Sequence, residues 1–107
     1  MISIPEADWK VLRSIHDVVL ARLCQRIINE VMLVAVDGLQ TSHERYGDIY
    51  GIVQDRNNDV ARMFDGMSRS KALDRIMMMR ADGLIEDDEY LRFSESTRAL
   101  IDGWLSR

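Results

Sequence analysis

The chain has 107 residues, of which 47 % are apolar and 30 % are charged, and its net charge at pH 7 is −4. This length fits one small domain, and this composition is that of a folded protein rather than a disordered one. The negative net charge argues against a protein that coats nucleic acid through bulk electrostatics. A local basic surface is still compatible with it, so the distribution of charge matters more than its sum.

The sequence indicates a cytoplasmic protein. Its single cysteine, Cys24, has no partner for an internal disulfide, which is typical of a reducing compartment. Near the start, Pro5 and Glu6 stand where a signal peptide would need a basic segment and an apolar stretch. The longest apolar run, 31–36, is far shorter than the roughly 20 residues of a membrane-spanning helix.

A long first helix is predicted from Pro5 to the Asp37-Gly38 pair. Pro5 suits a first helical turn, and Glu6 and Asp8 lie on the favourable side of the helix dipole. Apolar residues follow at steps of three or four and define one face. They are Trp9, Leu12, Ile15, Val19, Leu23, Ile27, Val31 and Val34. A helix of about 48 Å is too long for a core this small, so we expect an interruption or a second chain on this face. Residues 31–36 could instead form a strand on propensity alone.

The sequence pattern in the middle of the chain predicts two further helices. The sequence 41–44, Thr-Ser-His-Glu, is a capping box that opens a helix with Tyr46, Ile49, Tyr50 and Val53 facing inward. Residues 56–59, Arg-Asn-Asn-Asp, interrupt the apolar pattern. We therefore predict a break there, with Asn58 as the N-cap of a short separate helix.

The next predicted helix covers residues 68–82. Asp65 and Gly66 are predicted to turn the chain, and Ser68 is the expected N-cap. The helix should end at Gly83, which suits a left-handed position just past a helix C-terminus.

Residues 84–93 are ambiguous at the level of sequence. Ile85, Tyr90 and Phe93 favour strands, so this segment could form a short antiparallel hairpin around the acidic residues 86–89. The alternative is a turn or two of helix from Asp87 onward. In either case Ser94 is the predicted N-cap of a final helix.

Residues 59–100 resemble the winged helix-turn-helix of bacterial regulators of the MarR type. The features that carry this resemblance follow one another in the order seen in that family. They are Ala61 in a short helix, a turn at Gly66, Ser68-Arg69-Ser70 opening a helix, Gly83-Leu84-Ile85 leading into a wing, and Ser94 before a helix with Arg98. The turn is one residue longer than the common pattern, and the wing is very short with four acidic residues at its tip.

The resemblance implies a DNA-binding homodimer whose recognition helix, 68–82, enters the major groove. Charge supports this, because residues 62–80 hold five basic and only two acidic residues, a net charge of +3. Arg69 or Arg75 would read guanine, and Ser70 or Lys71 would hold phosphates. The long first helix would pair the two chains. The expected dimer interface comprises Trp9, Leu12, Ile15, Val19 and Leu23.

The fold expected from these features is a mostly α, winged helix-turn-helix-like bundle of four to five helices with a short β-hairpin. The alternative is an all-α bundle without a wing. We expect one domain, 1–107, in which residues 1–40 form the dimerising helix and 41–107 the helix-turn-helix-like part. The competing function is a non-enzymatic protein–protein interaction or dimerisation module without DNA binding.

Enzymatic and metal-dependent functions receive little support from the sequence. His16 and His43 stand alone, without Cys, Asp or Glu at metal-ligand spacing. Cys24 is more typical of a structural thiol than of a nucleophile. Methionines 77–79 suit an adaptable core. We therefore expect no catalytic residues, no metal and no cofactor.

Overall fold

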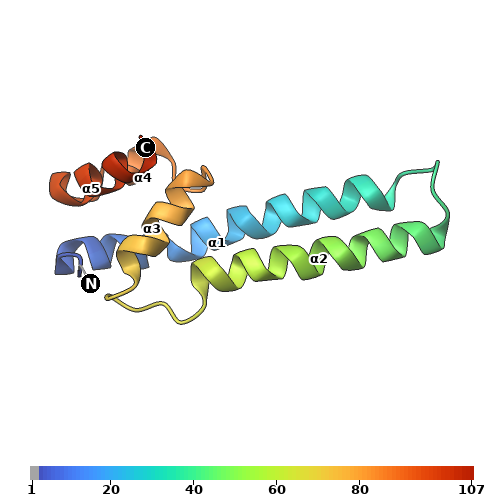
Figure 1. The fold of residues 1–107 in the computed structure, drawn as a ribbon, viewed down its shortest axis with the longest axis horizontal. Coiled ribbons are helices and arrows are strands. Elements are labelled where there is room, and N and C mark those ends of the chain that lie inside the picture. The colour runs from blue at the N-terminus through green and yellow to red at the C-terminus, as the bar shows by residue number, and fades with distance from the viewer. Residues whose placement is uncertain (1–2) are drawn as a thin grey trace.

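The computed structural model describes residues 3–107 and contains five α-helices but no strand within that range (Figure 1). They are α1 (Glu6–Ala35), α2 (Ser42–Phe64), α3 (Ala72–Ala81), α4 (Asp87–Tyr90) and α5 (Glu95–Leu105). Helices α1 and α2 form a long antiparallel pair, and the molecule is 52 Å in its longest dimension. Helices α3, α4 and α5 lie together over the first half of α1, and we call them the head. The part of the α1–α2 pair beyond it, residues 24–58, is called the arm.

Helix α1 is unbroken from Glu6 to Ala35, so both the predicted interruption and the alternative of a strand at 31–36 are wrong. Two different neighbours within the chain cover its apolar stripe. The head covers the first half, where Leu12 and Val19 are fully buried, and α2 runs alongside the second half. The chain thus folds back on itself along a helix that seemed too long for one small core.

Helix α2 begins at the predicted capping box. The Glu44 amide donates to Thr41 Oγ1 at 3.1 Å, and the Thr41 amide donates to Glu44 Oε1 at 3.0 Å. The predicted break at 56–59 is wrong, because α2 continues to Phe64. Arg56 explains this, since its guanidinium donates to Glu30 on α1 at 3.0 Å and to Asp59 one turn later at 3.3 Å. These contacts outweigh the modest helix propensity of asparagine and aspartate.

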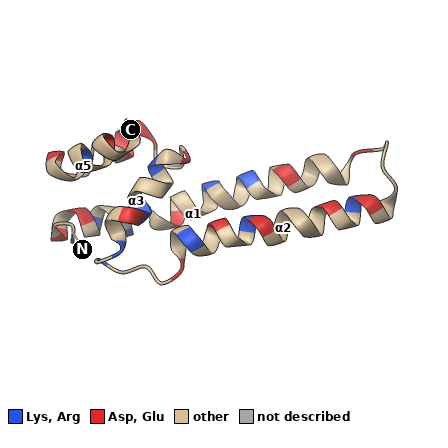
Figure 2. Cartoon of the chain, in the orientation of Figure 1, with Lys and Arg blue, Asp and Glu red and all other residues tan. Residues whose placement is uncertain are grey.

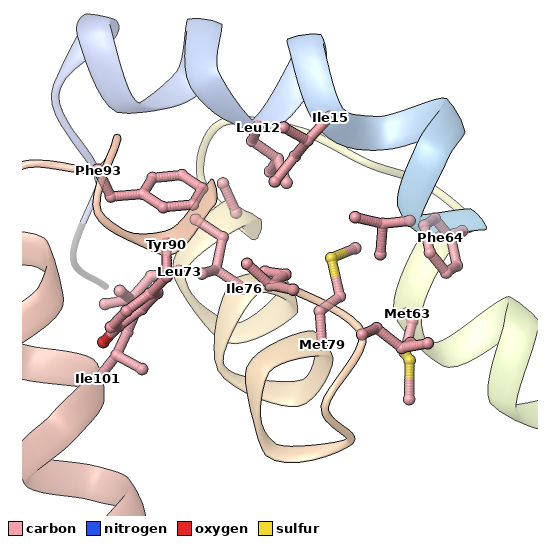
Figure 3. Close-up of a cluster of buried hydrophobic side chains, with 14 of the residues drawn as sticks. Leu12, Ile15, Met63, Phe64, Leu73, Ile76, Met79, Tyr90, Phe93 and Ile101 are labelled. Atoms are coloured by element: carbon pink, nitrogen blue, oxygen red, sulfur yellow. The ribbon is translucent and has the colours of Figure 1, made fainter. Parts of the chain in front are cut away.

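The hydrophobic core lies where the head meets the first half of α1 and the end of α2 (Figure 3). Side chains from all five helices and their connections contribute to it. The largest that are fully buried include Leu12, Met63, Ile76, Met79, Phe93 and Ile101. Figure 3 shows Ile76 and Met79 of α3 in the middle of this cluster, so α3 is the central element of the head.

The predicted wing is wrong, and the all-α alternative is confirmed. Residues 87–90 form the short helix α4 rather than the tip of a hairpin. Glu89 is the reason, because its carboxylate accepts a hydrogen bond from the Glu86 amide at 2.9 Å and closes a capping box. The same carboxylate accepts two hydrogen bonds from Arg22 of α1, at 2.5 and 3.0 Å. Acidic residues at a helix N-terminus also stabilise the helix through its dipole.

Helix α5 begins at Ser94, as predicted, and its first turn is fastened to α1. The Ser94 hydroxyl accepts a hydrogen bond from the Thr97 amide at 3.4 Å. The buried carboxylate of Asp8 accepts hydrogen bonds from the Ser94 amide at 2.7 Å, the Ser94 hydroxyl at 2.6 Å and the Thr97 hydroxyl at 2.5 Å. Asp8 therefore links the first turn of the first helix to the first turn of the last.

These two buried carboxylates should make the fold sensitive to acid. Burial raises the pKa of Asp8, but the hydrogen bonds from Ser94 and Thr97 outweigh it and hold that pKa below its ordinary value. The Arg22 guanidinium likewise lowers the pKa of Glu89. A lowered pKa in the folded state gives stability that is complete above about pH 5 and is lost as the pH falls below about 4. We expect the urea midpoint to fall steeply between pH 5 and pH 3. A urea midpoint that is constant over this range would contradict the lowered pKa values of Asp8 and Glu89.

Candidate interaction surface

The residues predicted to contact DNA lie at the junction between α2 and α3, and two of them are engaged within the chain. Arg69 donates to the Ile4 carbonyl and to the Glu6 carboxylate, both at 2.9 Å. Arg75 donates to the carbonyls of Arg62 and Ala61 at the end of α2. Both guanidiniums therefore hold neighbouring backbone segments in place.

The predicted recognition helix is also shorter at its N-terminus than expected. Helix α3 begins at Ala72, and residues 68–71 form a turn before it. The Ser68 hydroxyl lies 3.1 Å from the Ser70 hydroxyl rather than capping the helix, so the predicted N-cap is wrong. Ser70 and Lys71 are exposed. The predicted C-terminal end is confirmed, because Gly83 follows α3 with a φ of 70°.

The residues predicted for the dimer interface are placed in the core of the single chain. Leu12, Ile15, Val19 and Leu23 are all buried under the head, and Trp9 is half-buried against the same cluster. Their apolar surface is already covered within the chain by the head and by the end of α2. A second chain would need a different face of the molecule.

The arm is a two-helix structure with only one layer of contacts. Half-buried apolar side chains meet between the helices, and they are Ile27, Val31 and Val34 of α1 and Ile49 and Ile52 of α2. Arg45 donates to the Ala35 carbonyl at 2.6 Å, near the tip, and Arg56 contacts Glu30 nearer the head. Two helices alone bury one stripe each, so the remaining sides of the arm are exposed to solvent.

An apolar surface covers one side of the arm. Ile28 and Met32 directly follow contact residues of α1, and Tyr46, Tyr50 and Val53 directly follow contact residues of α2. In an antiparallel helix pair the positions that follow contact positions lie on the same side. These five side chains are about half exposed or more, and Tyr46, Tyr50 and Val53 were wrongly predicted to face inward.

No charged residue interrupts this side of the arm. Its members are Cys24, Ile28, Met32 and Ala35 of α1 and Tyr46, Tyr50, Val53 and Asn57 of α2, and we call them the uncharged face. Charged positions occur along both helices of the arm (Figure 2). Helical spacing places Arg26, Asp48 and Asp55 on the side opposite the uncharged face. An uncharged surface of this length is unusual in a chain with 30 % charged residues.

The head is attached to the side of α1 that points away from the uncharged face. Arg22 donates to the Leu84 carbonyl at 2.9 Å, and Arg26 donates to the carbonyls of Asp82 at 2.7 Å and Gly83 at 3.0 Å. Residues two positions apart on a helix lie about 200° apart. Cys24 and Ile28 therefore point away from the head, and the uncharged face is free along its length.

A second apolar surface lies on the head. Asp74, Met77 and Met78 of α3 and Trp104 of α5 line an open groove of about 370 Å³. Trp104 is 60 % exposed, and the guanidinium of Arg107 lies 5.4 Å from the centre of its ring. This groove is smaller than the uncharged face and has an acidic residue at its edge.

Two other features of the described residues bear on the kind of site to expect. Within residues 3–107, no group of three or more His, Cys, Asp or Glu side chains is arranged to hold a metal ion. None of the helices in that range is long and apolar enough to cross a membrane. Comparison of the chain with protein-family models, with curated proteins and with solved structures finds no match.

Proposed function

We propose that this chain is a non-enzymatic protein-interaction module whose binding surface is the uncharged face of the arm. The observation that carries the proposal is the exposure of Ile28, Met32, Tyr46, Tyr50 and Val53 on one side of a helix pair, without a charge among them. Exposed apolar surfaces of this kind mark protein-binding sites. Tyrosine and methionine are both enriched at such interfaces.

The geometry gives less support to DNA binding. Arg69 and Arg75 would have to leave their present partners before they could reach a base edge, and Arg69 would give up an ion pair with Glu6 at 2.9 Å. The turn at 68–71 also removes Arg69 and Ser70 from the helix that would enter a groove. Glu86, Asp87 and Asp88 follow the predicted recognition helix in the sequence and add negative charge, which repels phosphate.

A DNA titration separates the two functions. We expect no binding to mixed genomic fragments at about 50 mM salt, where phosphate contacts are strongest. Binding that weakens with Lys71→Ala, and whose salt dependence falls by about one ion in that variant, would support the regulator instead. Lys71 is the right position for this test, because it is exposed and its replacement leaves the contacts of Arg69 and Arg75 intact.

Photo-crosslinking in native cells tests the surface directly. A photoreactive phenylalanine analogue at Val53 should give a covalent adduct with a protein. The same analogue at Asp55 is the matched control, because it lies two residues away on the same helix and on the opposite side of the arm. Adducts at both positions in equal yield, or at neither, would contradict the proposal.

A further inference from the structure

We infer that the partner of the uncharged face is a second copy of this chain, so that two arms stack into a four-helix bundle. This inference rests on the proposed function and names the occupant of the same surface. A two-helix arm lacks a second layer, and stacking on an identical arm supplies one. Bundles of four helices are a stable way to bury such stripes.

The charge distribution favours a copy of the chain over a different protein. In a two-fold contact, the residues near the axis lie close to their own symmetry mates, so a charge there would meet a like charge. The chain has a net charge of −4, yet the eight residues of the uncharged face carry none. A surface built to select a different protein would normally carry charges that complement it. The uncharged face has the composition that self-pairing requires.

The exposed area is of the right size. Met32 and Tyr50 are each 57 % exposed, Tyr46 is 67 % exposed, and Ile28 and Val53 are close to 50 %. These five side chains together offer roughly 600 Å², and their neighbours on the face add to it, against ~800 Å² per partner in a standard interface. Two such faces together offer about 1,200 Å², which is the lower end of the size range of specific interfaces.

The position of the head leaves room for a second chain on the uncharged face. Arg22 and Arg26 hold α4 and the end of α3 on the opposite side of α1, so stacking two uncharged faces does not bring the heads between the arms. In the resulting dimer both heads lie on the outside. The groove of Met77, Met78 and Trp104 is then present twice and is not covered by the contact between the arms.

Two adjacent residues of α1 provide a matched test. Met32 lies on the uncharged face, and Leu33, which is 74 % exposed, lies about 100° around the helix and on the other side of the arm. Met32→Glu and Leu33→Glu make the same kind of change on the same turn. Met32→Glu should weaken self-association by at least about 100-fold, because it places two carboxylates in an apolar contact. Leu33→Glu should leave it within about threefold.

The measurement is sedimentation equilibrium of the full chain at about 1 to 100 µM. The unmodified protein should approach twice its 12.4 kDa chain mass. Far-UV circular dichroism and the urea midpoint show whether each variant is folded. If Met32→Glu is not folded, Tyr50→Lys provides a second disruption of the uncharged face. A protein that stays at 12.4 kDa throughout, or equal weakening by Met32→Glu and Leu33→Glu, would overturn the inference. A monomer that still forms an adduct with a different protein at Val53 would leave the proposed function standing and remove only the second copy.

Discussion

Replacing Arg22 with methionine should lower the free energy of unfolding by about 3 kcal/mol. The change leaves the Glu89 carboxylate, which is only 12 % exposed, without the guanidinium that binds both of its oxygens. The value is at the low end of the range for a broken buried ion pair, because Arg22 itself is 28 % exposed. Urea unfolding followed by circular dichroism at pH 7 measures it.

The control for this prediction is Arg13→Met on the same helix. Arg13 is exposed and lies 5.6 Å from the ring of Trp9, so its replacement should cost less than about 1 kcal/mol. The double variant Arg22→Met, Glu89→Gln should recover part of the lost stability, because glutamine carries no charge to desolvate and its side-chain oxygen can still accept the hydrogen bond from the Glu86 amide. Equal effects of Arg22→Met and Arg13→Met would show that the pair contributes nothing to the head.

Replacing Asp8 with alanine is the second substitution with a large expected effect, again about 3 kcal/mol. It removes the acceptor of the Ser94 amide and of the hydroxyls of Ser94 and Thr97. Those donors lie in or near the core, and the hydrogen bonds they lose are made to a charged group, which are the stronger ones. The melting temperature should fall by more than about 10 °C.

Asp17→Ala is the appropriate comparison for Asp8→Ala. The Asp17 side chain is 99 % exposed on the same helix, so its loss should change stability by less than about 0.5 kcal/mol. The pH dependence offers a second check on the same site. In Asp8→Ala the loss of stability between pH 5 and pH 3 should be smaller than in the unmodified protein, because one of the two carboxylates with a lowered pKa is absent.

Local sequence signals predicted the ends of several helices well. The capping box at Thr41 and Glu44, the N-cap at Ser94 and the glycine after α3 are all present as expected. Each depends on hydrogen bonds or backbone angles within a few residues. Such signals can be read without knowing which elements pack together.

Several of the errors concern contacts between distant residues. Arg56 holds α2 intact by reaching Glu30, and Arg22 supports α4 by reaching Glu89, 67 residues away. Neither partnership has a signature in local sequence. An apolar stripe likewise does not identify the segment that covers it. Leu12 and Val19 were therefore predicted to contact a second chain, although the head of the same chain buries them.

The candidate surface was missed for the same physical reason. Tyr46, Tyr50 and Val53 have the spacing of a buried stripe, and only the rotation of α2 against α1 determines that Ile52 joins Ile49, which was predicted to face inward, in that role. A sign was nevertheless available in the composition. In each arm helix, the uncharged residues occupy a wider part of the helix surface than contact with one neighbouring helix can bury.

The link between Asp8 and Ser94 has a consequence for the order in which the molecule assembles during synthesis. The arm joins segments that are close in sequence, since α1 and α2 are separated only by residues 36–41. The Asp8–Ser94 hydrogen bonds close a loop of 86 residues, so they must wait for almost the whole chain. All residues of the arm have therefore been synthesised while the head is still open. In the proposed dimer, a nascent chain would present the uncharged face first, and neighbouring chains on one message would be able to pair before either has finished its core.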